Sequence, residues 1–184
     1  MKLIAITTPY FWNGEHTAVV RLLESRTCWR VHIRKPQATL SEMREFIEHI
    51  PERFYPYLSI HDHFGLAAEM GIGGIHLNSR NPSRPEGWKG TTSRSCHCID
   101  ELSAYSNDAD YLFLSPVFDS ISKPGYRSAF NLSDIKRAGI SGKNIFALGG
   151  VTFEKLPLLE DAGFDGAAML GAAWKDFAAS TAFK

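Results

Sequence analysis

Short apolar segments alternate with segments of helical periodicity along the whole chain, and this alternation constrains the fold more than any other feature. We predict eight strands, over Leu3–Thr7, Trp29–Ile33, Tyr57–Ile60, Gly74–Leu77, Gly90–Ser93, Tyr111–Ser115, Ile145–Leu148 and Ala167–Leu170. We predict helices over Glu15–Ser25, Ser41–His49, Phe64–Met70, Cys98–Tyr105, Leu132–Ala138, Phe153–Asp161 and Ala172–Ala179. The segment Asn81–Trp88 contains two prolines and a glycine, which predict a loop or a single turn. Buried strands that alternate with helices indicate a parallel sheet.

A repeated pattern supports this assignment. Residues 68–77 (AEMGIGGIHL) resemble residues 161–170 (DAGFDGAAML), and residues 108–114 (DADYLFL) form a looser third copy. In the first two copies, one glycine suits the end of a helix and a second glycine begins the next strand. About eight such units within 184 residues predict a single domain, a (β/α)8 TIM barrel over residues 1–184. The alternative is a doubly wound open sheet, but no Gly-x-Gly-x-x-Gly motif follows the first predicted strand.

Charge and composition exclude several classes of partner. The chain has 20 basic and 20 acidic residues, so we expect neither nucleic acid nor a membrane surface as a partner. No apolar run approaches the roughly 20 residues of a membrane span. The first residues lack the pattern of a secretory signal, and the three cysteines have no disulfide-framework spacing. We therefore expect a cytoplasmic location.

Two glycine turns late in the chain predict a phosphate site. Gly149 and Gly150 follow one predicted strand, and Leu170 and Gly171 end the next. Without a Cβ atom, the backbone N–H groups of such turns can approach a ligand oxygen closely. The loops after strands seven and eight form the phosphate site of many (β/α)8 barrels. The simpler alternative is that these glycines serve only the tight turns.

Polar residues also follow the earlier strands, at the end of the barrel where active sites lie. His32 and Arg34 have the same parity, so both are expected to point into the barrel mouth, where Arg34 suits a phosphate or a carboxylate. His61 and Asp62 follow the third strand, and Asp62 is either a Mg2+ ligand or a helix cap.

The loops after the fifth and sixth strands supply further candidates. His97 is a candidate acid and base near neutral pH, and Ser95 a candidate donor to an anion. The adjacent residues 96–98 cannot surround zinc as a tetrahedron. A loop bounded by proline and glycine is expected either to bind an anion or to be simply solvated. Its candidate ligands are Ser120, Ser122 and Lys123.

With these residues in place, the chain resembles the thiamine phosphate synthase/TenI superfamily over nearly its whole length. Val31–Arg34 is similar to the family's strand-two motif, Gly74–Leu77 to its Gly-Val-His-Leu, and Arg94–His97 to its Ser-x-His segment. Three later segments resemble its Gly-Pro-Val-Phe, Thr-x-Thr-Lys and Ala-Ile-Gly-Gly-Ile motifs. These are Ser115–Phe118, Ser120–Lys123 and Ala147–Val151. The resemblance implies a (β/α)8 barrel that binds a thiazole phosphate, with the phosphate on Gly149, Gly150 and Gly171.

The resemblance also implies one of two reactions. A synthase joins hydroxymethylpyrimidine pyrophosphate to thiazole phosphate, releases pyrophosphate and holds Mg2+ between two aspartates. A tautomerase aromatises a carboxythiazole phosphate by a proton shift and needs no metal. Here Asp62 matches the first aspartate, but the second falls near Asn81. The family's strand-two lysine falls at Pro36, and Lys35 beside it is expected to point the other way.

These departures from the synthase pattern favour the tautomerase, because a pyrophosphate leaving group needs several negative charges compensated. In that reaction His97 would move the proton, with His61 as the rival base, and Arg34 would hold the carboxylate. No cofactor is then required. The alternatives are a synthase with Mg2+ on Asp62 and a non-catalytic thiazole-phosphate-binding barrel. The expected partners are small molecules: thiazole phosphate and, for a synthase, hydroxymethylpyrimidine pyrophosphate. The sequence is compatible with a homodimer.

Overall fold

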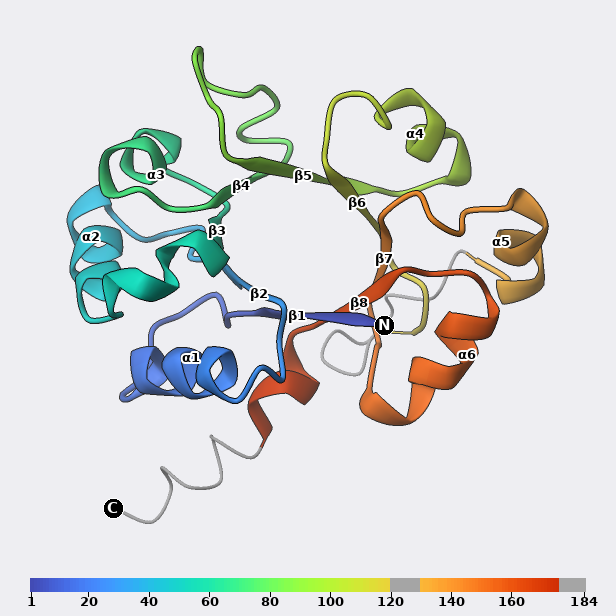
Figure 1. Ribbon diagram of the computed structural model, residues 1–184, viewed down its shortest axis with the longest axis horizontal. Coiled ribbons are helices and arrows are strands. Elements are labelled where there is room, and N and C mark those ends of the chain that lie inside the picture. The colour runs from blue at the N-terminus through green and yellow to red at the C-terminus, as the bar shows by residue number, and fades with distance from the viewer. Residues whose placement is uncertain (120–129, 176–184) are drawn as a thin grey trace.

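The computed structural model describes residues 1–119 and 130–175, and it confirms a closed barrel of parallel strands (Figure 1). The strands are β1 (Lys2–Ile6), β2 (Arg30–Ile33), β3 (Leu58–Ile60), β4 (Gly74–Leu77), β5 (Thr91–Cys96), β6 (Tyr111–Leu114), β7 (Ile145–Leu148) and β8 (Gly166–Met169). Each strand pairs with the next in the chain, and β8 pairs with β1. The open doubly wound sheet is therefore excluded.

Helices surround the ring of strands on its outside (Figure 1). They are α1 (Glu15–Glu24), α2 (Leu40–Glu48), α3 (Phe64–Met70), α4 (Ile99–Ala104), α5 (Leu132–Ala138) and α6 (Leu156–Asp161), with 3-10 helices η1 (Glu52–Tyr57) and η2 (Phe153–Lys155). Most bounds agree with the predicted ones within one residue, and the segment between β4 and β5 is a loop as predicted. Helix η1 was not predicted, and β5 extends to Cys96, three residues beyond its predicted end. Among the residues described, no helix has the length and hydropathy needed to cross a membrane.

The glycines of the repeated pattern have the two roles that the sequence predicts. Gly71 ends α3 with φ +72°, and Gly163 follows α6 with φ +94°, a region that other residues rarely adopt. Gly74 and Gly166 begin β4 and β8, and a Cβ atom on either would collide with a side chain of a neighbouring strand. The repeat thus marks two helix-to-strand connections in which the glycines have the same roles.

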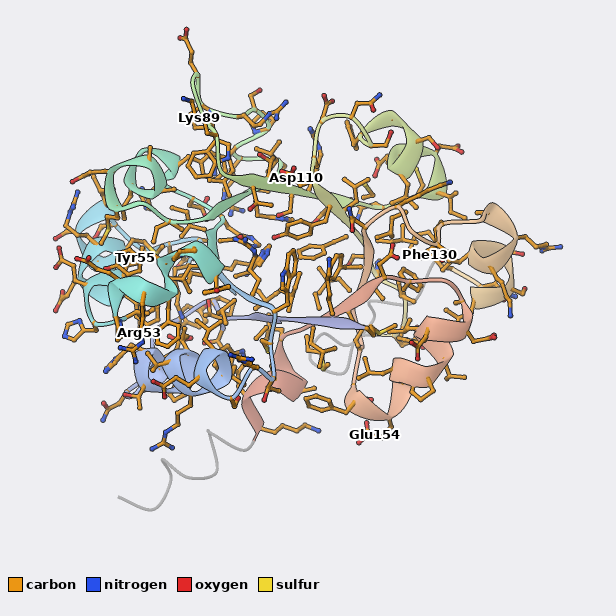
Figure 2. All side chains as sticks on the ribbon, viewed as in Figure 1. Arg53, Tyr55, Lys89, Asp110, Phe130 and Glu154 are labelled. Atoms are coloured by element: carbon orange, nitrogen blue, oxygen red, sulfur yellow. The ribbon has the colours of Figure 1, made fainter. Side chains whose placement is uncertain are left out.

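Side chains fill the interior of the barrel (Figure 2), and their chemistry differs between its two halves. On the side of β6–β8 and β1, the buried side chains form an apolar cluster of Ile4, Ile6, Tyr111, Phe113, Phe146 and Ala168. On the side of β2–β5, the buried side chains are polar: Arg30, His32, Ser59, His61, His76 and Ser93. Buried polar groups need hydrogen-bond partners, so this half of the barrel is where chemistry is expected.

Candidate functional site

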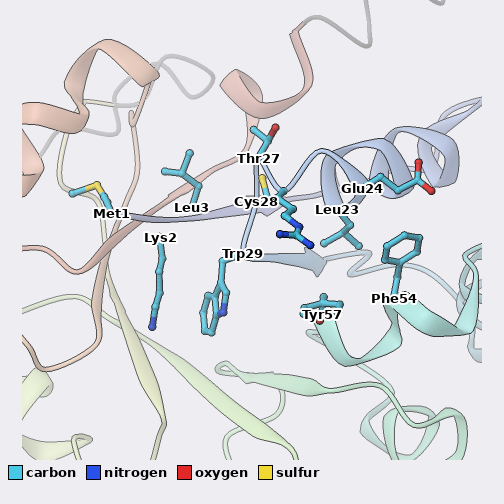
Figure 3. A pocket seen from close by; sticks show the side chains of 11 residues that line it. Met1, Lys2, Leu3, Leu23, Glu24, Thr27, Cys28, Trp29, Phe54 and Tyr57 are labelled. Atoms are coloured by element: carbon cyan, nitrogen blue, oxygen red, sulfur yellow. The ribbon is translucent and has the colours of Figure 1, made fainter.

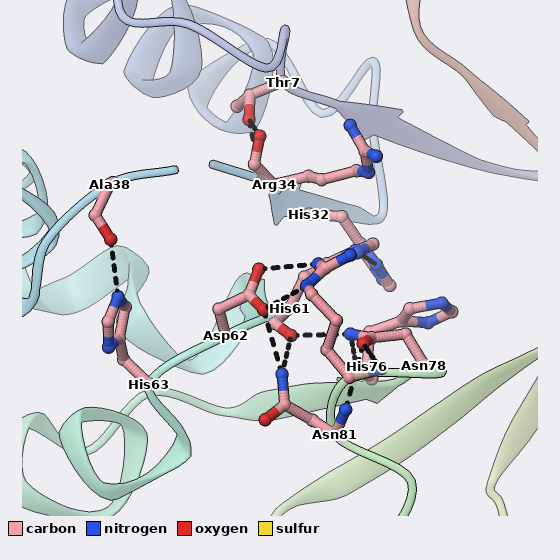
Figure 4. Close-up of polar contacts among 11 residues, drawn as sticks. Thr7, His32, Arg34, Ala38, His61, Asp62, His63, His76, Asn78 and Asn81 are labelled. Atoms are coloured by element: carbon pink, nitrogen blue, oxygen red, sulfur yellow. Dashed lines mark hydrogen bonds and ion pairs between the residues drawn. The ribbon is translucent and has the colours of Figure 1, made fainter. Parts of the chain in front are cut away.

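Three buried histidines meet in the polar half of the barrel (Figure 4). His32 lies in β2, His76 in β4, and His61 directly follows β3. Nδ1 of His32 is 3.0 Å from Nε2 of His61, and the rings of His61 and His76 stack with their centroids 4.2 Å apart. The three side chains therefore form one cluster, which we call the histidine cluster.

Hydroxyl groups of the barrel interior bind the outer members of this cluster. Nε2 of His32 lies 2.7 Å from Tyr111 Oη. His76 lies between two serines, with Nδ1 2.9 Å from Ser93 Oγ and Nε2 3.0 Å from Ser95 Oγ. Ser93 Oγ donates its hydrogen to the Ile75 carbonyl, so it accepts from His76. His76 is therefore protonated at Nδ1 and accepts from Ser95 at Nε2.

Burial keeps the histidine cluster neutral. Desolvation lowers the pKa of His76 to about 3 and the pKa values of His32 and His61 well below their ordinary value. The charges of nearby arginines lower these pKa values further, Arg34 for His61 and His76 and Arg80 for His61. At neutral pH the three imidazoles thus act as uncharged hydrogen-bonding groups.

Three arginines surround the histidine cluster at the carboxyl ends of the strands. Arg34 is partly buried just beyond β2, and burial and the charge of Arg80 lower its pKa. Arg80, in the loop after β4, is held by Asp62. Arg94, in β5, lies over the Tyr105 ring at 3.9 Å from its centroid. These arginines make the carboxyl end of the barrel positive, which suits an anionic ligand. A single guanidinium group can donate two parallel hydrogen bonds to two oxygens of a phosphate or carboxylate.

The surroundings of Asp62 do not fit a Mg2+ site. Arg80 donates to both carboxylate oxygens, at 3.1 Å to Oδ1 and 3.0 Å to Oδ2, and Asn81 donates to Oδ1 at 2.9 Å (Figure 4). Mg2+ is usually bound through carboxylates and phosphates, whereas Asp62 has an arginine and an amide as its partners. The alternative of a helix cap is wrong, because His63 is the N-terminal cap residue of α3 and no side chain caps it.

The histidine cluster has the residue type, but not the surroundings, of a transition-metal site. One nitrogen of each imidazole lies within 4.8 Å of the others, and zinc commonly binds three histidines. However, His32 and His76 use both ring nitrogens in hydrogen bonds. The positive charges of Arg34 and Arg80 act on the same space and oppose a dication. We therefore treat the cluster as a hydrogen-bonded unit.

Lys35 points away from this site, as its parity predicts. Its Nζ donates to both carboxylate oxygens of Glu15 in α1, at 2.7 and 2.6 Å, and to the carbonyls of Thr8 and Tyr10 at 2.8 Å. Both charged side chains are fully buried. The pair therefore fixes the loop between β1 and α1, and Lys35 Nζ does not face the carboxyl ends of the strands, where a ligand would bind.

His97 lies beyond the end of β5, where it is exposed. Its Nδ1 is 3.0 Å from the Ser115 carbonyl, which can only accept, so the hydrogen is on Nδ1 and Nε2 is left to accept when the ring is neutral. The structure thus separates the two predicted bases: His97 is exposed and His61 is buried in the histidine cluster.

The glycine turn after β7 is required by packing. Gly149 and Gly150 have φ +95° and +61°, and a Cβ on Gly149 would lie 2.7 Å from Pro116 Cα. Leu170 is partly buried against the apolar interior cluster, and Gly171 is exposed, with no atom of residues 1–119 or 130–175 within 4 Å of its Cβ position. The predicted ligands Ser120, Ser122 and Lys123 lie outside the described residues.

A cavity of about 630 Å3 opens at the other end of the barrel (Figure 3). It lies at the amino ends of β1 and β2 and is lined by residues that include Lys2, Trp29 and Tyr57. None of the predicted site residues lines it. Active sites of such barrels form at the carboxyl ends of the strands, so we place the site at the histidine cluster and the arginines.

Several residues of this site were not predicted from the sequence. Tyr111 belongs to an apolar strand segment, and Arg80 lies in an irregular loop, so neither has a periodicity that marks it. Arg30 and Ser59 share the parity of His32 and His61 in their strands, and that parity is the signal that could have identified them.

Comparisons with known proteins agree with this fold. A family model described as thiamine monophosphate synthase matches residues 3–173. Thiamine-phosphate synthase of Synechococcus sp. is 32% identical over 126 residues, 65% of this chain and 36% of that protein. The Thermus thermophilus enzyme is 31% identical over 110 residues, 56% of this chain and 53% of that protein. These matches thus span about a third and about half of the relatives' lengths.

Solved structures give the same result over a longer range. The thiamine phosphate pyrophosphorylase of Bacteroides thetaiotaomicron has a TM-score of 0.84 and 34% identity, and the match covers 95% of this chain and 85% of that one. The Pyrococcus furiosus pyrophosphorylase, at 21% identity and a TM-score of 0.76, has the same fold.

Proposed function

The chain belongs to the thiamine monophosphate synthase family, and we propose that it is an enzyme of thiamine biosynthesis that acts on a thiazole phosphate. The proposed reaction is that of the synthase, in which a pyrimidine pyrophosphate is coupled to the thiazole phosphate. The names of the relatives favour this reaction over the tautomerase that the sequence favours. The cytoplasmic location expected from the sequence is part of the proposal.

The arginines at the strand ends are the structural support for this reaction. As pyrophosphate leaves, its bond to the pyrimidine methylene breaks and negative charge develops on its oxygens, where preorganised donors act. Arg34, Arg80 and Arg94 supply positive charge at this end of the barrel, and Asp62 orients Arg80 through a two-point hydrogen bond. The contact between Arg80 and Asp62 is the observation that carries the proposal. It places a positively charged guanidinium group beside the carboxylate that corresponds to a metal ligand of the family.

Coupling is therefore expected to proceed without Mg2+. With both substrates present, formation of thiamine phosphate and release of pyrophosphate should be the same in excess EDTA and in added Mg2+. Replacing Arg80 with glutamine removes its guanidinium group and should lower kcat/KM on the order of 100-fold. This is the range found when a hydrogen-bond donor to the transition state is lost. Both products can be followed by chromatography.

Arg84 offers a matched control, because it is an exposed arginine of the same loop. Arg84→Gln should turn over like the wild type. A rate that requires Mg2+, or full activity in Arg80→Gln, would show that Arg80 does not compensate the leaving group.

The phosphate of the thiazole substrate is assigned to the late glycine turns. We propose that it lies at the backbone N–H groups of Gly149, Gly150 and Gly171, as the resemblance implies. Positive φ at Gly149 and Gly150 means that a side chain there would disturb the fold as well as any ligand. A Cβ on Gly171 would have no atom of the described residues within 4 Å, so Gly171 is the better position for a test.

Gly171→Val should weaken thiazole phosphate binding about tenfold or more, on the order of 1.4 kcal/mol, with little change in the thermal unfolding midpoint. The valine side chain would extend into the open space where the phosphate is placed. Isothermal titration calorimetry measures the affinity. Equal affinity in Gly171→Val and in the wild type would show that the phosphate does not bind at this turn.

A tautomerase is the second candidate. An amide, that of Asn81, rather than a second carboxylate contacts Asp62, and the Nδ1 contact of exposed His97 with the Ser115 carbonyl leaves Nε2 to accept a proton from the substrate. A carboxythiazole phosphate supplied alone, with no pyrimidine substrate, decides between the reactions. Its conversion to the aromatic thiazole, followed by NMR, would establish the tautomerase and replace the synthase proposal.

A further inference from the structure

Five buried side chains form a line of hydrogen bonds across the barrel interior. Arg30 Nη1 donates to Ser59 Oγ at 3.1 Å, and Ser59 Oγ lies 3.4 Å from Tyr111 Oη. Tyr111 Oη lies 2.7 Å from Nε2 of His32, whose Nδ1 lies 3.0 Å from Nε2 of His61. All five residues are buried. The line therefore connects a fixed positive charge to His61, which directly precedes Asp62 in the chain.

The direction of these hydrogen bonds follows from the first donor. A guanidinium only donates, so Ser59 accepts from Arg30. Among the described contacts of Ser59 Oγ, Tyr111 Oη is the group that can accept, so we direct the Ser59 hydrogen to it. The hydrogen of Tyr111 is then assigned to its short 2.7 Å contact with Nε2 of His32, which places the single hydrogen of neutral His32 on Nδ1. Nδ1 of His32 faces Nε2 of His61, which accepts. Neutral His61 consequently carries its hydrogen on Nδ1.

We propose that Tyr111 and His32 are positioning residues, which hold His61 as a neutral Nδ1–H donor for the anionic group of the substrate. This group would be the leaving pyrophosphate, so the identity of the anion rests on the proposed function. The tautomer of His61 is independent of the proposed function.

The surroundings of His61 agree with this role. Its backbone carbonyl accepts from Asn78 at 2.7 Å and from Asn81 at 3.2 Å, which fixes its main chain (Figure 4). The charges of Arg34 and Arg80 help to lower its pKa, so the ring stays uncharged beside them. A fixed neutral donor next to two guanidinium groups adds a hydrogen bond to an anion without a proton transfer.

Nitrogen-15 NMR of the histidine rings tests the tautomer directly in the free protein. We expect the wild type to show His61 protonated at Nδ1 only. Tyr111→Phe keeps the ring and removes the hydroxyl, so His32 loses the donor that sets its tautomer. His32 and His61 should then each show a mixture of tautomers. Ser59→Ala interrupts the same line one step earlier and serves as the second variant.

Two further variants separate this effect from a general loss of stability. Tyr55→Phe removes another buried tyrosine hydroxyl, which donates to the Ile47 carbonyl at 3.2 Å, and should leave the His61 signals unchanged. His32→Gln offers an amide that can both accept from Tyr111 and donate to His61, so His61 should keep its Nδ1–H form. His32→Leu can do neither, and His61 should become a mixture.

In the coupling assay, Tyr111→Phe should lower kcat roughly tenfold, as loss of an orienting partner commonly does, with a smaller change in KM. An Nε2–H form of wild-type His61, or unchanged His61 signals in Tyr111→Phe, overturns the inference. Zn2+ binding that is lost in His32→Leu also overturns it, because a metal would take the lone pairs that the line requires. If coupling fails while the His61 signals behave as expected, the failure counts against the proposed function alone.

Discussion

Lys35→Met is expected to lower the free energy of unfolding by about 3–5 kcal/mol, the usual effect of removing one partner from a buried ion pair. Nζ of Lys35 lies 2.6 Å from Oε2 of Glu15, and neither side chain is exposed. Burial raises the pKa of Glu15 and lowers that of Lys35, and their mutual hydrogen bond opposes both shifts. Without Lys35, the buried carboxylate of Glu15 loses its counter-charge, and the carbonyls of Thr8 and Tyr10 lose the Nζ donor.

Urea unfolding at pH 7 measures this change, and two controls give it meaning. Lys136→Met breaks an exposed ion pair with Asp161 and should cost less than about 1 kcal/mol. The double variant Lys35→Met with Glu15→Gln removes both charges, so it should recover part of the stability that Lys35→Met loses. If Lys35→Met and Lys136→Met lowered the free energy of unfolding by similarly small amounts, water would have to reach the pair of Lys35 and Glu15.

Stability is expected to fall steeply below pH 6.5, because the histidine cluster is buried in its neutral form. The unfolded chain takes up protons at His32, His61 and His76 near their ordinary pKa of about 6.5, whereas the folded chain does not. The unfolded state then binds more protons, so the free energy of unfolding decreases as the pH decreases and is unaffected above about pH 7.5. With about 1.4 kcal/mol for each histidine, the loss between pH 7.5 and 5.5 is roughly 4 kcal/mol.

Urea unfolding at pH 7.5, 6.5 and 5.5 gives this dependence. His76→Gln should remove about a third of it, or roughly 1.4 kcal/mol, since one titrating group is lost. His49→Gln replaces an exposed histidine on the outside of the barrel and should leave the dependence as it is. A loss of only about 1 kcal/mol in the wild type would show that the cluster takes up protons while folded.

The fold could be predicted from the sequence because most strands are apolar on both faces. Strand β7 (IFAL) and its neighbours are buried between the barrel interior and the helices, so a continuous apolar run identifies them. Strand β5 (TTSRSC) has no such run, because its serines bind His76 inside the barrel, and its end was therefore placed too early. Helix η1 contains Pro56, which resembles a loop signal.

The positions of the candidate site residues could be predicted in part, for a related reason. Arg34, His61 and Asp62 follow recognisable strands, so their place at the barrel mouth follows from parity and strand order. The partner of Asp62 could not be found in this way, because Arg80 reaches it from an irregular loop. The contact between His32 and Tyr111 crosses the barrel from β2 to β6, over 79 residues, and no local pattern encodes it.

The divided interior of the barrel imposes different evolutionary constraints on its two halves. Phe113, Phe146 and Ile4 pack as an ordinary apolar core, where one residue can be exchanged for another of similar volume. In the opposite half, most buried polar side chains hydrogen-bond to a side chain from another strand, so a single replacement leaves another group unsatisfied. Substitutions on that side must therefore accumulate as compatible sets. Such a barrel can acquire a new reaction by remodelling β2–β5 together, while the strands opposite continue to hold the chain in its fold.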